Sequence, residues 1–213
     1  MTRATLVCAA VLLLVSAVPS SAQNAVTMRG FADAGLTVFT ATQSFKAVLG
    51  SPTGAVFGGG VEVGLTRNVF VSLAASRFKK TGQRVFVFQN QVFKLNVDDT
   101  VAVTPLQVSA GYRFRGRRPS RIIPYAGGGI GWYRLTETSE PSTPGDDTKT
   151  THAGFHLLAG IETPIRRWAG AAVDAQWSSV PNSLGESTTS VASLYDEHNL
   201  GGFMLRARII VGR

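Results

Sequence analysis

The sequence predicts an all-β fold, a single eight-stranded antiparallel up-and-down barrel that crosses a membrane with its strands. Three observations lead to this prediction. Apolar and polar residues alternate in eight separate stretches, short basic turns and long polar loops join these stretches in turn, and an export signal precedes the first of them. Short turns on one side and longer loops on the other are typical of transmembrane β-barrels.

The N-terminus has the parts of a secretory signal. Arg3 supplies the positive charge, and an apolar run and a group of small residues follow it. We therefore expect a cleavable signal peptide over residues 1–22 and one mature barrel domain over residues 23–213. The apolar run is shorter than the roughly 20 residues that a spanning helix needs, which disfavours an uncleaved anchor. Cleavage would remove Cys8, the only cysteine, so disulfides and thiolate metal sites are not expected.

Eight strands are expected from the alternation and from the enrichment of β-branched and aromatic residues. They lie at about residues 27–39, 56–66, 69–79, 101–114, 122–136, 151–164, 169–180 and 200–212. Three shorter connections would fall on one side, at residues 66–68, 115–121 and 165–168. Four longer connections would fall on the other side, at residues 40–55, 80–100, 138–150 and 181–199.

The apolar and polar residues fall on opposite faces in most of the strands. In the last strand Leu205 and Ile209 share one face, whereas Arg206 and Arg208 share the other. The second, fourth, sixth and seventh strands divide in the same way, and the third is ambiguous. The apolar face suits lipid and the polar face suits a barrel interior. This parity predicts a charge network in the lumen made of Asp33, Glu62, Arg113, Glu162, Asp174, Arg206 and Arg208. Because eight strands enclose a space about wide enough for side chains alone, we expect the network to fill the lumen.

Aromatic residues near the strand ends are expected to form girdles at the two membrane interfaces. The expected girdles are Tyr112, Phe114 and Trp168 at the inner rim and Phe155, Trp177 and Phe203 at the outer rim. The second long loop differs from the others because residues 84–95 have the pattern of a hairpin that extends above the membrane. Its Phe86, Phe88 and Phe93 are candidate contacts for an external partner. Alternatively, they pack against neighbouring loops or continue the lipid-facing wall.

The chain is basic, with a formal net charge of +8. Its cations gather in the predicted short turns and not in a recognition motif, so we expect no nucleic-acid partner. The three histidines lack the spacing of a metal site, and the glycine runs fit no phosphate-binding loop. We therefore expect no catalytic residue, no metal and no cofactor.

Several segments together resemble one known group of proteins. They are Gly30-Phe31-Ala32-Asp33-Ala34-Gly35-Leu36, Ala110-Gly111-Tyr112-Arg113-Phe114, Pro124-Tyr125-Ala126-Gly127-Gly128-Gly129-Ile130-Gly131 and Leu200-Gly201-Gly202-Phe203. The chain resembles the small eight-stranded outer-membrane β-barrel superfamily, the OmpA-type transmembrane domain and its relatives. The resemblance implies the outer membrane of a Gram-negative-type bacterium, with outer-membrane lipid and the assembly machinery as partners.

Three functions are consistent with these expectations. The first is a non-enzymatic barrel with a structural or surface-interaction role that depends on its external loops. The second is a narrow channel for small solutes or hydrophobic compounds. The third is a soluble periplasmic lipocalin-like carrier, whose apolar face would have to point inward. Inward Arg206 and Arg208 beside outward Ile209 and Val211 oppose the third.

Overall fold

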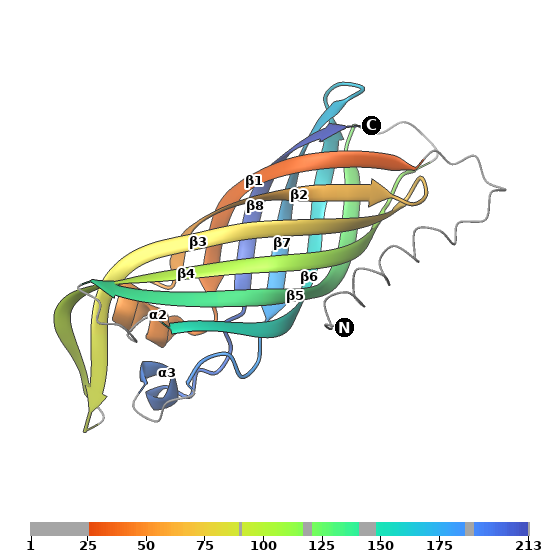
Figure 1. Cartoon of the computed structure of the whole chain (residues 1–213). Coiled ribbons are helices and arrows are strands. Elements are labelled where there is room, and N and C mark those ends of the chain that lie inside the picture. The colour runs from red at the N-terminus through yellow and green to blue at the C-terminus, as the bar shows by residue number, and fades with distance from the viewer. Residues whose placement is uncertain (1–25, 90, 117–120, 141–147, 186–189, 213) are drawn as a thin grey trace, which may run out of the picture.

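The computed structural model describes residues 26–89, 91–116, 121–140, 148–185 and 190–212, so the expected signal peptide lies outside the described residues. Each strand pairs with its sequence neighbours and β1 pairs with β8, which closes an antiparallel barrel (Figure 1). The strands are β1 (Thr27–Phe39), β2 (Thr53–Gly64), β3 (Val69–Phe88), β4 (Gln91–Arg113), β5 (Ile123–Glu140), β6 (Thr148–Pro164), β7 (Ala169–Ser179) and β8 (Gly202–Gly212). The predicted eight-stranded up-and-down barrel is confirmed.

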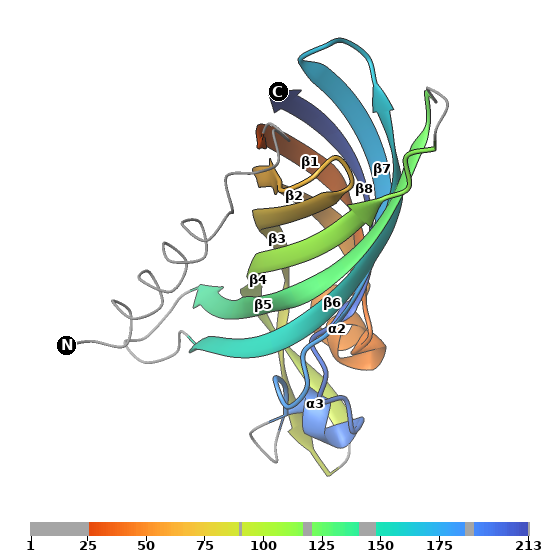
Figure 2. The ribbon, with the colours of Figure 1, turned by 90° about the vertical axis from the view of Figure 1, so that its right-hand side faces the viewer.

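The two ends of the barrel differ. The short β2–β3 and β6–β7 turns lie at one end, together with the start of β1 and the end of β8; we call this the turn end. The helices α2 (Thr42–Leu49) and α3 (Val191–Leu194) lie at the opposite end, beside the projecting β3–β4 hairpin (Figures 1 and 2). We call this the loop end. None of the helices in the described ranges is long and apolar enough to cross a membrane.

Strands β3 and β4 are longer than the sequence predicted. The connection over residues 80–100 contains the predicted hairpin, and its pairing is continuous with the barrel strands. Pairing continues from Thr81 opposite Thr100 to Phe88 opposite Gln91, with one register shift between Gln83 and Val85. The physical reason is that the backbones of two strands can pair even where neither strand has an apolar face. The end of the alternation therefore does not mark the end of a strand.

The other long connections also contain more structure than expected. The 40–55 connection contains α2, which ends at Gly50 with φ 74° and a backbone N–H donated to Lys46 O. This left-handed conformation favours glycine. The 138–150 connection is shorter than predicted, since β5 runs to Glu140 and β6 starts at Thr148.

The outer wall is apolar and the interior is largely polar. Leu36, Phe57 and Ile130 are each more than half exposed on the outer face. The ambiguous third strand resolves in the same sense, with Phe70, Ser72 and Ser76 buried inside. An apolar outer wall is suited to lipid. These faces are the reverse of those that a soluble carrier would need.

Candidate functional site

Two arginines and two glutamates meet inside the lumen at the turn end. Arg29 from β1 reaches Glu62 of β2 and Glu162 of β6, with N–O distances of 2.6 Å in both cases. Arg113, the last residue of β4, contacts the same two carboxylates at 2.6 and 3.0 Å. The four side chains therefore form a ring of alternating charge, which we call the ion-pair ring. Because its members come from strands around the whole barrel, the ring spans the opening.

A second charged cluster lies deeper in the lumen, around Asp174 of β7. Its carboxylate contacts Arg206 Nη2 at 2.7 Å and Arg208 Nε at 2.8 Å, and it accepts a hydrogen bond from the Tyr125 hydroxyl. Asp174 is only 1 % exposed. Arg206 also donates to Gln176 Oε1 at 3.0 Å. A buried carboxylate is costly to desolvate unless it is paired and hydrogen-bonded, and these partners meet that need.

The structure places the seven charged residues predicted for the lumen inside the barrel, but it does not connect all of them. Asp33 is buried opposite Arg208 across the β1–β8 pair, yet it forms no ion pair within the described residues. The structure adds Arg29, which the sequence analysis did not name. Arg29 has the inward parity of Asp33, four residues earlier in β1, so extending the alternation would have found it.

A layer of uncharged polar side chains lies on the loop-end side of the charged clusters. Ser109 Oγ of β4 and His156 Nε2 of β6 are 2.8 Å apart, although β5 lies between their strands. Gly129 is the residue of β5 between them, and a Cβ there would overlap the carbonyl oxygen of Val108. Glycine therefore permits a contact across an intervening strand. This observation supports a structural role for the glycine run.

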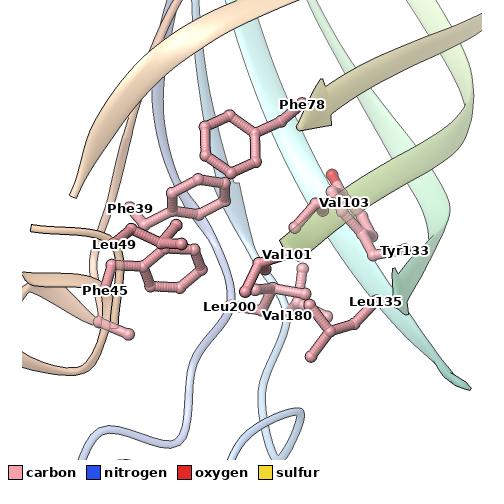
Figure 3. Close-up of a cluster of buried hydrophobic side chains, with 11 residues drawn as sticks. Phe39, Phe45, Leu49, Phe78, Val101, Val103, Tyr133, Leu135, Val180 and Leu200 are labelled. Carbon is pink, nitrogen blue, oxygen red and sulfur yellow. The ribbon is translucent and has the colours of Figure 1, made fainter. Parts of the chain in front are cut away.

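Apolar side chains form a buried cluster at the loop end (Figure 3). The group, which we call the apolar plug, consists of Phe39, Ala41, Phe45, Leu49, Phe78, Val101, Val103, Tyr133, Leu135, Val180 and Leu200. The rings of Phe39 and Phe45 stack with centroids 4.1 Å apart, and Phe78 meets Phe39 edge-on at 5.0 Å. Sequence reasoning did not find the plug, because several members lie in α2 or in a connection where strand parity gives no direction.

Glu197 holds α2 over the plug. Its carboxylate accepts hydrogen bonds from the backbone N–H groups of Gln43 and Ser44 and from the Ser44 hydroxyl, at 2.9, 2.7 and 2.7 Å. The first N–H groups of a helix have no partner within the helix, and a carboxylate there is favourable. The Glu197 carboxylate therefore caps the N-terminus of α2.

The predicted interfacial aromatics lie on the outer wall and are all 42 % exposed or more. Tyr112 and Phe114 contact one another near the turn end, and Trp168 lies in the β6–β7 turn. Phe155 and Trp177 contact one another with ring centroids 5.6 Å apart, nearer the loop end, where Trp177 also pairs with Phe203. Trp132, 45 % exposed, is a further outward aromatic that was not predicted.

The candidate external contacts lie on the projecting β3–β4 hairpin. Phe93 is 42 % exposed, and its backbone pairs with that of Phe86. The side chains of Phe86 and Phe88 lie outside the described part of the structure. Beside the hairpin, a cavity of about 420 Å³ opens between α2, α3 and the inner faces of β4 and β5. The loop end thus has both a projecting hairpin and a cavity.

Comparisons with known proteins agree with this architecture. The family model described as "outer membrane protein beta-barrel domain" matches residues 10–200. The structure of neisserial surface protein A is similar, with a TM-score of 0.55 and 14 % identity over 87 % of this chain and 97 % of that one. A major outer membrane protein from Thermus thermophilus gives a TM-score of 0.54 and 12 % identity over 89 % of this chain and all of that one. No curated protein matches by sequence.

Proposed function

Because this chain belongs to the outer membrane protein beta-barrel domain family and lies in the outer membrane of a Gram-negative-type bacterium, we propose that it is a closed, non-enzymatic barrel that presents its loop end to the outside. Its role would be structural or in surface interaction. The observation that carries the proposal is that two chemically different barriers, the ion-pair ring and the apolar plug, lie in series in the lumen. Solute passage would have to disrupt both.

The pairing of the lumen carboxylates supports a structural role for them. Glu62 and Glu162 each contact two guanidinium groups, and Asp174 contacts Arg206 and Arg208. These carboxylates are occupied by contacts within the barrel, whereas a general acid or base must be within hydrogen-bond reach of a substrate. The groups therefore suit the filling and bracing of the barrel better than catalysis.

The loop end is the part suited to surface interaction. Outer-membrane barrels have short periplasmic turns and longer external loops, and this pattern supports an orientation in which the hairpin and the helices α2 and α3 lie outside the cell. Binding residues commonly lie on loops that a rigid scaffold positions. Here the scaffold is the closed barrel, and α2 is held to it by the plug and by Glu197.

The test compares cells that lack the protein with cells that make the full chain or a variant in which residues 83–96 are replaced by Asn-Gly. We would measure cell–cell sedimentation and the sensitivity of the outer membrane to detergent. A surface role predicts that cells with the variant no longer sediment together, although their outer membrane stays resistant to detergent. A structural role predicts that the variant gives cells that lack the protein the same detergent resistance as the full chain does. No difference between any of the strains would contradict the proposal.

A further inference from the structure

We propose that the outer surface of β3–β5, directly above the apolar wall, binds the phosphate groups of an anionic lipid headgroup in the outer leaflet. The surface contains Arg77, Lys79, Arg134 and the neighbouring Lys149, and we call it the basic patch. The patch lies on the wall of the barrel and not on the loop end itself. Its assignment to the outer leaflet rests on the orientation proposed above, with the loop end outside the cell, but not on closure of the lumen or on a role in surface interaction.

The outward-facing residues change from apolar to basic between one cross-strand row and the next. Ala75, Leu106 and Trp132 lie side by side on β3, β4 and β5. Two residues further along each strand, the same register brings Arg77, Thr104 and Arg134 together. The next row runs from Lys79 through Ala102 and Thr136 to Lys149 of β6.

The position of the patch corresponds to the headgroup level of the outer leaflet. Below it, Leu73, Leu106 and Ile130 are 45, 45 and 58 % exposed, as expected of side chains that contact acyl chains. Trp132, in the last apolar row, is a residue type that concentrates at membrane–water interfaces. Two residues of strand correspond to about 7 Å, so Arg77 and Arg134 lie directly above the apolar band.

The cationic groups of the patch are available to a ligand. In the described ranges, Arg77, Lys79 and Arg134 form no ion pair, in contrast to the paired arginines of the lumen. They line a hollow of about 640 Å³ together with hydroxyl groups of Thr81, Thr100, Thr104, Thr136 and Thr138, and with Asp98 at its upper edge. Guanidinium groups bind phosphate oxygens in a bidentate manner, and hydroxyl groups supply further donors.

The patch is confined to one side of the barrel. The outward faces of β1, β7 and β8 contain no basic residue in the described ranges, and near the loop end they present Val38, Trp177 and Phe203. A cationic belt around the whole barrel would indicate general attraction to an anionic surface. A single hollow with three unpaired cations indicates a bound headgroup, and its place directly above the acyl-chain wall favours a membrane lipid over a soluble anion.

The test measures the lipid retained by the detergent-purified chain, by native mass spectrometry, after titration with lipid A. Arg77→Gln, Lys79→Gln and Arg134→Gln are combined in one variant. The control combines Arg67→Gln, Arg166→Gln and Arg167→Gln, which removes the same charge from exposed turns at the opposite end. A heat-dependent shift in gel mobility checks that each variant is folded.

We expect the patch variant to bind lipid A about 100-fold more weakly, since each cation contributes a factor of about five near an anionic surface. The control should bind as the unmodified chain does, and dephosphorylated lipid A should bind weakly to all three proteins. Equal losses in both variants, or no loss in either, would overturn the proposal. Displacement of the lipid by an excess of inorganic phosphate would show a free-anion site and would overturn the assignment to a lipid.

Discussion

The two barriers that we propose for the lumen are held together by opposite physical means. At the turn end, the ion-pair ring is held by directed contacts of 2.6–3.0 Å between charged groups. At the loop end, the apolar plug is held mainly by shape and by exclusion of water, and its directed contacts include aromatic ring contacts and a hydrogen bond from Gln107 to the Tyr133 hydroxyl. The difference teaches that one barrel can combine a barrier that depends on charge with one that depends on volume. Substitutions that preserve shape but remove charge should separate the two.

The largest effect is expected from Glu162→Gln in the ion-pair ring. The substitution keeps the size of the side chain but leaves Arg29 and Arg113 with one carboxylate between them. Removing one partner of a buried ion pair costs about 3–5 kcal/mol. Urea unfolding of the chain in lipid vesicles measures the loss, with the exposed Asp98→Asn as control. A loss below about 1 kcal/mol would mean that the ring is not a coupled buried network.

The stability that the plug provides should depend on the volume of its side chains and not on their exact chemical type. Leu200 is 1 % exposed, so Leu200→Ala should cost about 3 kcal/mol because it leaves a cavity. Leu200→Met conserves volume and should cost less than about 1.5 kcal/mol. The same unfolding measurement applies to both variants. If both substitutions lowered the free energy of unfolding equally, the plug would depend on the exact side chain as the ring does. The contrast between the two ends would then not hold.

A smaller and local effect is expected at the cap of α2. Glu197→Gln weakens the three hydrogen bonds that Gln43 and Ser44 donate, and it removes a charge at the helix N-terminus. Loss of a cap costs about 1 kcal/mol. Hydrogen exchange of the α2 amides should accelerate about fivefold while strand amides are unchanged. Equal acceleration in the strands would indicate global destabilisation.

The smallest effect is a dependence of the β7–β8 connection on pH. A hydrogen bond to the Leu184 carbonyl raises the pKa of His198 above its usual range, and a second one to Asp196 adds to this. Since the raised pKa belongs to the folded state, its stabilisation is present below the ordinary histidine pKa and is lost as pH rises through the folded value. The protection factors of amides near Ser183, which correct the exchange rates for the intrinsic effect of pH, should therefore be larger at pH 5.5 than at pH 8, and His198→Gln should abolish the difference. Equal protection factors at the two pH values in the native chain would contradict this prediction.

More of the charged turn end than of the apolar loop end could be predicted from the sequence. The period of two residues, applied to strands with an apolar and a polar face, was sufficient for the fold and for the inward direction of Glu62, Glu162 and Asp174. It could not reveal which charges pair, because Arg29 reaches Glu162 across the lumen, where sequence separation carries no information. It could not reveal the plug, because Phe45 and Leu49 lie in α2, where a period of two residues gives no direction.

The central claim is that the lumen is closed by both barriers in series, and conductance across a planar bilayer tests it most directly. The refolded chain should show no steady ohmic conductance. Phe78→Ala, which opens the plug, and Glu162→Gln, which weakens the ring, should each remain closed, because the other barrier is intact. Current should appear when the two substitutions are combined. Steady porin-like conductance of the unmodified chain would contradict the claim and favour a channel.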